Sequence, residues 1–240
     1  MNRSKYRELF RLRAEGKLPP MECTKSCLEH LNSFLMPDSV FSIYKSYDGF
    51  HFLDVPCGAG HYFTMLQSLG DIVYHGVDVD SGMIKNAKEV WGKTMNATFT
   101  VGDVCRLPFP DDSFNVVLCY NLLLHLPQGY KKALQELCRV VKPDGRLLIR
   151  SLFDDHESIL SIDNDFYNTY SRDDVRKFLL TLPDKYSCWF YPDSVVVDQK
   201  DIEMQSKTLN VDESEFTVDS LFKGYNMNYE TVIIEKWRME

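Results

Sequence analysis

Short apolar stretches alternate with helical ones from residue 50 onward. The apolar stretches, each of strand length, are residues 50–55, 72–79, 97–103, 114–120 and 146–152. Helical stretches fill the intervals 61–69, 81–91 and 129–142. Strands that alternate with helices form parallel sheets with right-handed crossovers. The pattern therefore predicts an α/β fold around an open, largely parallel sheet.

The N-terminal part is predicted to form two helices, residues 4–15 and 21–36, which a Leu-Pro-Pro segment separates. Cys23, Cys27 and His30 lie on one face of the second helix, at a spacing that resembles part of an iron–sulfur motif. Three ligands on one continuous helix are poorly placed for a cluster. We therefore predict no metal site and expect these side chains to pack in the interior.

The C-terminal part departs from the regular alternation. A helix is predicted at 171–182, with Ser171 at its N-cap and two aspartates in its first turn. The tail is predicted to be mostly β and to end in a strand at 229–235, whereas 192–224 shows too little periodicity for an assignment.

Composition and net charge indicate which class of protein this is and which kinds of partner it could bind. The 240 residues, 44% hydrophobic and 26% charged, are typical of a globular protein. A formal net charge of −8 disfavours a sequence-independent grip on nucleic-acid phosphates. The net basic segment 1–17 is best interpreted as a solvated helix face. We therefore expect a small-molecule partner and no nucleic acid.

Cysteine usage and hydropathy favour a cytoplasmic protein. Seven cysteines, an odd number in mostly apolar context, indicate free buried thiols in a reducing compartment. No apolar run approaches the roughly 18 residues that cross a bilayer, and the N-terminus lacks the apolar core of a secretory signal. We expect no membrane association, and the oligomeric state stays open.

Three acidic residues end three successive predicted strands: Asp54, Asp78 and Asp103. Each follows the previous one by a single β-α-β step, so all three should line one rim of the sheet, where a glycine turn follows the first. The Asp78 carboxylate could accept hydrogen bonds from both hydroxyls of a ribose. The Asp103 carboxylate could accept one from the exocyclic amine of a base. Val104 and Met83 offer apolar surface to a base. This rim suits an adenosine-like ligand.

Five segments in this region resemble the class I S-adenosylmethionine-dependent methyltransferases, specifically a methyltransferase type 11/25-like domain. Each segment alone is weak, but five in order with suitable spacing are specific. They are Asp54-Val-Pro-Cys-Gly-Ala-Gly60, Gly76-Val-Asp-Val-Asp-Ser-Gly-Met-Ile84, Gly102-Asp-Val104 with Leu107-Pro-Phe-Pro-Asp-Asp-Ser-Phe-Asn115, Tyr120-Asn-Leu-Leu-Leu-His-Leu-Pro127 and Arg139-Val-Val-Lys-Pro-Asp-Gly-Arg-Leu-Leu-Ile149.

The resemblance implies a fold and a division of the chain. The fold would be a Rossmann-like, doubly wound, seven-stranded mixed sheet with an N-terminal helical cap. Residues 1–240 would form a single methyltransferase domain. Within it, 1–48 would be the cap, 49–152 the cofactor-binding core, and 153–240 the substrate-side region that completes the sheet.

The resemblance also implies S-adenosylmethionine as the cofactor and a set of residues that bind it. These residues are Asp54, Pro56, Cys57, Gly58, Gly60, Asp78, Val79, Met83, Gly102, Asp103, Val104, Tyr120 and Asn121. Two positions depart from the family pattern. Pro56 replaces a glycine and removes one amide donor from the turn. Asp144 replaces the second glycine of a Lys-Pro-Gly-Gly turn, which aspartate tolerates.

Catalysis of methyl transfer needs little chemistry from the protein. A methyl group on a sulfonium is already activated, so alignment of the acceptor and exclusion of water do most of the work. His125 is a candidate general base, although a buried packing role is an alternative. Tyr120 is a second candidate catalytic residue. Arg150 and the segment 154–156 follow the fifth predicted strand and could orient the acceptor.

Several functions stay open beside methyl transfer to a small molecule, whose acceptor atom (O, N or C) is undetermined. One alternative is an NAD(P)-binding oxidoreductase, whose dinucleotide-binding motif also begins with Gly-x-Gly and is followed by an acidic residue near the position of Asp78. In this chain, however, Phe63 stands where that motif needs a third glycine. A non-catalytic module that binds S-adenosylmethionine or S-adenosylhomocysteine is another alternative. An RNA or protein acceptor is a further one.

Overall fold

The computed structural model describes five continuous segments of the chain and a few single residues near the N-terminus. The segments are 46–126, 130–154, 159–162, 165–196 and 226–238, and the single residues are 11, 12, 15, 17, 31, 34 and 35. Most of the predicted helices 4–15 and 21–36, and nearly all of 192–224, lie outside the described residues. Described positions within those two predicted helices are helical at 11, 12, 31, 34 and 35.

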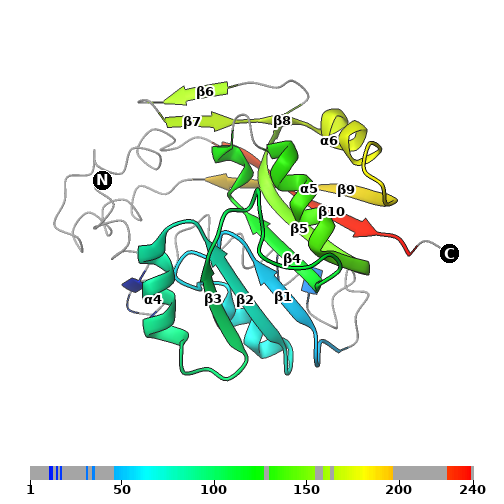
Figure 1. Ribbon diagram of the computed structural model, residues 1–240. Coiled ribbons are helices and arrows are strands. Elements are labelled where there is room, and N and C mark those ends of the chain that lie inside the picture. The colour runs from blue at the N-terminus through cyan, green and yellow to red at the C-terminus, as the bar shows by residue number, and fades with distance from the viewer. Residues whose placement is uncertain are drawn as a thin grey trace.

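A single mixed sheet organises the molecule (Figure 1). Its first five strands in spatial order are mutually parallel, and β10 runs antiparallel to both of its neighbours. The Rossmann-like mixed sheet predicted from the sequence is confirmed; seven strands follow one another across it, and an eighth, two-residue strand pairs off this path. The spatial order is β3 (Ala97–Val101), β2 (Val73–Asp78), β1 (His51–Asp54), β4 (Phe114–Tyr120), β5 (Val141–Asp154), β10 (Asn226–Lys236) and β9 (Tyr186–Val196).

Two hydrophobic clusters cover the two faces of the sheet. On one face, apolar residues of α5 (Tyr130–Val140) and α6 (Arg172–Leu179) pack against β4, β5 and β10. On the other face, α3 (Phe63–Leu66) and α4 (Ser81–Trp91) pack against β1 to β4, together with Leu31, Phe34 and Leu35 of the N-terminal segment. This is the doubly wound arrangement: the helices that connect β1 to β2 and β2 to β3 cover one face, and the helix that connects β4 to β5 covers the other.

Helix α4 has the bounds that its sequence predicted. The Asp80 carboxylate accepts hydrogen bonds from the backbone N–H groups of Gly82 (2.7 Å) and Met83 (3.1 Å). These donors have no partner inside the helix, so the acidic N-cap fixes where α4 begins.

Two predicted helices are shorter than expected. The stretch 61–69 forms only α3 and the 3-10 turn η1 (Gln67–Leu69), which ends at Gly70 with φ of 144°. The stretch 171–182 forms α6, which ends at Leu179, three residues before the predicted end. Ser171 occupies the predicted N-cap position, but its side chain makes no capping hydrogen bond.

The predicted turn before the fifth strand lies inside β5. Pairing with β4 jumps from Phe114 opposite Val141 to Val116 opposite Arg146. The intervening turn contains Asp144, whose φ is 62°. Aspartate therefore takes the left-handed conformation that glycine has in the family pattern.

The sequence did not predict three short strands that follow β5. Strands β6 (Ile159–Ile162) and β7 (Asp165–Asn168) form an antiparallel hairpin, and the two-residue β8 (Tyr170–Ser171) pairs with the end of β5. Strand β7 contacts η2 (Leu123–His125), the turn that follows β4. The hairpin thus lies over the carboxyl end of β4 (Figure 1).

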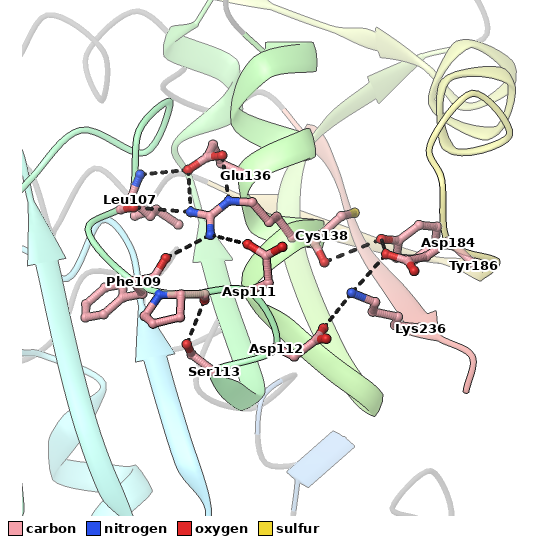
Figure 2. Close-up of polar contacts among 12 residues, drawn as sticks. Leu107, Phe109, Asp111, Asp112, Ser113, Glu136, Cys138, Asp184, Tyr186 and Lys236 are labelled. Atoms are coloured by element: carbon pink, nitrogen blue, oxygen red, sulfur yellow. Dashed lines mark hydrogen bonds and ion pairs between the residues drawn. The ribbon is translucent and has the colours of Figure 1, made fainter. Parts of the chain in front are cut away.

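A polar network joins the segment between β3 and β4 to helix α5. The Arg139 guanidinium donates to the backbone carbonyls of Leu107 (3.2 Å) and Phe109 (2.8 Å) and to the Asp111 carboxylate (2.9 Å). It also donates to Glu136, whose Oε2 accepts from the Leu107 N–H at 2.9 Å. Figure 2 shows these partners converging on one point. The network fixes the segment that follows Asp103.

A buried cation, Lys236, joins strand β10 to two loops. The Lys236 ammonium contacts the Asp112 carboxylate at 2.7 Å and the Asp184 carboxylate at 3.0 Å. Its side chain is only 5% exposed, and Figure 2 shows both contacts. Strand β10 is thereby joined to loops on both of its sides.

We expect Arg139→Met to lower the free energy of unfolding by about 2 to 4 kcal/mol, because it leaves a half-buried carboxylate and two carbonyls without their donor. Urea unfolding followed by circular dichroism measures this. The matched control is Arg238→Met, which removes an exposed ion pair with Asp144 and should cost less than about 0.5 kcal/mol. Equal effects of the two substitutions would contradict this interpretation.

Candidate active site

The three acidic residues that the sequence singled out follow the ends of neighbouring strands. Asp54 ends β1, Asp78 ends β2, and Asp103 comes two residues after β3. The register aligns Asp54 with Gly76, so these strands end at one rim (Figure 1). Ligands of doubly wound sheets bind beyond the carboxyl ends of the strands. The structure therefore brings these three residues to the expected edge.

Asp54 is completely buried. The Tyr74 hydroxyl donates to its Oδ2 at 2.6 Å, whereas Oδ1 accepts no hydrogen bond from the described residues. Burial raises the pKa of Asp54 to about 7; the Tyr74 hydrogen bond opposes this rise, and the nearby Asp78 charge adds to it. A buried carboxylate oxygen without a donor is suited to a cationic or N–H group of a ligand.

Asp78 holds the glycine turn in place. Its Oδ2 accepts from the Gly58 N–H at 2.9 Å, and its Oδ1 accepts from the Asp80 N–H at 2.8 Å. Burial raises the pKa of this carboxyl, while the two backbone hydrogen bonds work against that rise. A carboxylate oxygen accepts about two hydrogen bonds, so each oxygen retains capacity for a ligand hydroxyl.

The turn between β1 and α3 is ordered by its backbone. The Cys57 N–H donates to the Val77 carbonyl, and the Gly60 N–H donates to the Cys57 carbonyl, both at 2.9 Å. Gly58 and Gly60 have φ of 52° and 81°, which side chains rarely adopt. The peptide bond before Pro56 is cis. These contacts order the turn although Pro56 contributes no amide donor.

Two of the predicted cofactor-binding residues, Cys57 and Gly60, present no side chain at the rim, so only their backbone could contact a ligand. The Cys57 thiol is buried against Gly76, and burial raises its pKa well above the usual range. A Cβ added to Gly60 would lie 2.7 Å from the Trp91 ring, whose N–H donates to the Ala59 carbonyl. Close packing of Trp91 therefore requires glycine at position 60.

The predicted surface for a base is only partly open. Val79 is 74% exposed beside the rim, whereas Met83 and Val104 are buried in the core. Asp103 is exposed, and its carboxylate accepts from the Cys105 N–H at 2.9 Å. Gly102 donates its N–H to the Asp78 carbonyl at 3.0 Å. Val79 and Asp103 are thus the open members of this group.

The end of β4 carries the predicted catalytic candidates. Tyr120 is buried and packs edge-to-face on Tyr62, with ring centroids 5.6 Å apart. Asn121 has φ of 59°, and its N–H donates to the Arg150 carbonyl at 2.8 Å. Non-glycine residues in this conformation are concentrated at functional sites.

His125 lies in the turn η2, where its side chain is exposed. The expected alternative of a buried packing histidine is therefore wrong. The Tyr170 hydroxyl contacts the backbone carbonyls of Leu123 and Leu126 on either side of it. These contacts fix the turn that carries the imidazole. Of the other predicted orienting residues, Arg150 is wholly buried on β5, while 155–156 lies outside the described residues.

Sequence reasoning missed Tyr74 and Tyr62 as partners of the site. Alternation along β2 places Tyr74 on the same face as Gly76 and Asp78, and a buried tyrosine hydroxyl requires a polar partner. That signal could have found the bond to Asp54. The contact between Tyr62 and Tyr120 joins the N-terminus of α3 to β4. These residues are far apart in the sequence, so no local sequence pattern could have predicted their contact.

Fold and rim together define an α/β protein of the nucleotide-cofactor-binding kind. Residues 53–149 match the family model described as a methyltransferase domain. In this segment, which is less than half of the chain, the protein is similar to S-adenosylmethionine-dependent methyltransferases.

Relatives of this chain methylate different atoms, by their names. An O-methyltransferase of Penicillium expansum, cnsE, is 32% identical over 111 residues, which are 45% of this chain and 40% of that protein. The ubiquinone/menaquinone biosynthesis C-methyltransferase UbiE of Rickettsia massiliae is 33% identical over 129 residues, 50% of each chain. The matched segment thus spans half or less of these curated relatives.

A solved structure supports the fold. Phosphoethanolamine N-methyltransferase 2 of Haemonchus contortus, in complex with phosphomonomethylethanolamine and S-adenosylhomocysteine, superposes with a TM-score of 0.63. The match covers 90% of this chain and 53% of that one, at 17% sequence identity. Across the described residues, no helix has the length and apolar character that crossing a membrane requires.

The free energy of unfolding of the wild type should fall as pH rises, and we expect Asp54→Asn to make this fall smaller. The folded pKa of about 7 lies above the ordinary value, so the unfolded chain releases this proton first. The free energy of unfolding therefore falls as pH rises from about 4 through about 7. The melting temperature of the ligand-free wild type should drop by several degrees more than that of the variant between about pH 5 and about pH 8.

Calorimetry at several pH values measures this difference. Asp71→Asn is the matched control, because Asp71 is exposed at the opposite end of β2. Its pH profile should parallel that of the wild type. Parallel profiles for Asp54→Asn as well would show that Asp54 does not titrate with a raised pKa.

Proposed function

We propose that this protein transfers the methyl group of S-adenosylmethionine to a small-molecule acceptor. The observation that carries the proposal is the pair of buried carboxylates at the ends of adjacent strands. Asp54 has an oxygen that accepts no hydrogen bond from the described residues, and Asp78 supports the glycine turn while retaining acceptor capacity. An ammonium group and a ribose diol are the ligand groups that such a pair fits.

The described residues fit the donor along the rim. Asp54 and the backbone of the glycine turn would hold the amino-acid end, and Asp78 would hold the ribose. Asp103 and Val79 would face the base, the first through its carboxylate and the second through its exposed methyl groups. Residues 49–152 would thus form the cofactor-binding core, with 153–240 on the acceptor side.

When bound, the donor supplies an electrophilic methyl group on a sulfonium. The chain's own contribution is to align the acceptor and to exclude water. Tyr120 and Tyr62 form an aromatic contact at the end of β4, where an acceptor would lie. His125 is exposed on the anchored η2 turn, so its imidazole could accept a proton from an acceptor hydroxyl or amine.

The oxidoreductase alternative is disfavoured by the position of Phe63. Its ring lies 4.8 Å from Tyr74 and 5.4 Å from Trp91 by centroid distance, inside the core. A third glycine for a pyrophosphate-binding turn has no counterpart there. A binding module without catalysis, and an RNA or protein acceptor, are tested by transfer assays.

A cytoplasmic location is part of the proposal. Within the described segments, the thiols of Cys57, Cys119, Cys138 and Cys188 are free. Burial raises the pKa of Cys119 and of Cys138, so both thiols are inert packing groups. Free thiols are the usual state in a reducing compartment.

Isothermal titration with S-adenosylmethionine, S-adenosylhomocysteine and NAD tests the cofactor assignment. Binding of the first two is expected, and binding of NAD alone would overturn it. Labelled-methyl transfer into small-molecule, RNA and protein fractions of a cell extract then tests the acceptor. Label in the small-molecule fraction is expected. Binding without any transfer would support the binding module.

We expect Asp78→Ala to weaken S-adenosylhomocysteine binding by about a hundredfold, because two hydrogen bonds to a charged acceptor contribute roughly 1.5 kcal/mol each or more. Titration calorimetry measures the affinity, and circular dichroism checks that the variant is folded. Asp71→Ala, at the other end of β2, should bind within about twofold of the wild type. Unchanged affinity in Asp78→Ala would show that the ribose lies elsewhere.

A further inference from the structure

Strand β3 is an outer strand of the sheet, and among the described strands it pairs only with β2 (Figure 1). At one end of this pair the Tyr74 N–H donates to the Asn96 carbonyl. At the other end the Gly102 N–H donates to the Asp78 carbonyl. Alternate residues of a parallel strand bond to the same neighbour, so the even-numbered residues from 96 to 102 face β2. The residues whose N–H and C=O groups point outward are Ala97, Phe99 and Val101.

The edge of β3 has none of the features by which proteins keep edge strands from pairing. Such features include charged side chains, prolines and bulges along the open edge. Residues 97–101 read Ala-Thr-Phe-Thr-Val, with no charged residue and no proline. Their register with β2 is continuous. Strand β3 is therefore an open template for another strand.

The outer strand at the opposite edge, β9, is protected in this respect. The Trp237 N–H donates to the Lys185 carbonyl just before β9 begins. Inward-facing and outward-facing positions alternate along an edge strand, and Pro192 stands seven residues after Lys185, in the outward-facing row. Proline offers no N–H to a further strand. Of the two edges of the sheet, β3 is thus the one that can accept a partner.

Apolar side chains are exposed around β3. Met95, just before the strand, is 95% exposed, and Val101, its last residue, is 51% exposed. Thr98 and Thr100 are exposed on the other face of the same strand. Exposed apolar groups at both ends of an open edge indicate a surface that a protein partner covers.

The pattern of β3 is complementary to itself in one antiparallel register. With Phe99 on a two-fold axis, Phe99 of each copy faces the other, and Ala97 faces Val101 of the second copy. All three outward-facing residues then exchange hydrogen bonds. Thr98 lies opposite Thr100 of the second copy, and facing threonines form a favourable cross-strand pair. The sequence of the edge therefore fits a second copy of the same strand.

The charges nearest to this edge along the chain favour the same arrangement. Lys93 precedes β3, and Asp103 follows it. Both side chains are exposed. An antiparallel alignment brings the basic end of one strand to the acidic end of the other, whereas a parallel alignment places like charges together.

We propose that this protein forms a two-fold symmetric homodimer in which the β3 strands of two copies pair antiparallel and join their sheets into one. Strand β3 has only five residues, so the contact is small. A small interface predicts a weak dimer that dissociates on dilution. The proposal does not depend on the chemistry assigned to the rim.

Sedimentation velocity of the full chain at about 1, 10 and 100 µM tests the dimer, because a weak interface predicts monomer at the lowest concentration and dimer at the highest. Monomer at all three concentrations overturns the proposal. Val101→Pro removes an outward-pointing N–H but no hydrogen bond to β2, so it should weaken dimerisation at least about tenfold. Val101→Thr keeps that N–H and should dimerise within about twofold of the wild type.

Circular dichroism checks that each variant is folded. Val101→Lys keeps the test valid if Val101→Pro does not fold, because a lysine on an edge strand opposes pairing. Trp189→Lys is the control for the other edge: Trp189 is an exposed side chain of β9 and should not affect the dimer. A dimer that Trp189→Lys abolishes and Val101→Pro leaves intact would place the contact at β9 and overturn the proposal.

Cysteine cross-linking tests the register. An equimolar mixture of Thr98→Cys and Thr100→Cys should form an intermolecular disulfide on mild oxidation, because facing Cα atoms of such a pair are about 4.5 Å apart. Each variant alone should cross-link far less, since its cysteine faces a threonine of the second copy. The wild type, oxidised in the same way, measures cross-linking by its own cysteines. Equal yields from the mixture and from either variant alone would overturn the antiparallel register.

Discussion

A carboxyl group without contact with water, Asp54, is the constraint on which the rest of the site depends. Its ionisation costs free energy in the empty protein, because one tyrosine hydroxyl is its only donor among the described residues. A ligand cation that reaches it removes that cost. The same burial that lowers stability above neutral pH would therefore favour a positively charged group at this position.

The order of the strands explains why this carboxyl, although completely buried, lies at the rim beyond which ligands of doubly wound sheets bind. The chain runs outward from β1 to β2 and β3 on one side, then returns to β4 and β5 on the other. Helices of the two halves cover opposite faces, so the loops after β1 and β4 diverge and leave the rim between them accessible. Antiparallel β10 and β9 then extend the sheet beyond β5.

Local rules predicted the parts of the structure that local interactions determine. Helix α4 begins at its acidic cap, and the strands of the parallel sheet appear as apolar runs that end in functional residues. The sequence also located Asp54, Asp78 and Asp103 on one rim. It could not show that Met83 turns inward, that Trp91 fills the space beside Gly60, or that β6 and β7 form a hairpin, because tertiary packing decides these features.

The contact between Trp91 and the glycine turn gives the protein an intrinsic optical probe. The Trp91 indole N–H donates a hydrogen bond to the Ala59 carbonyl, which lies in the loop between β1 and α3. The other two tryptophans, Trp189 and Trp237, are exposed at the far edge of the sheet. Emission from the partly buried indole is therefore spectrally distinct from theirs and follows any movement of the turn. Rapid-mixing fluorescence can time ligand entry without an attached dye.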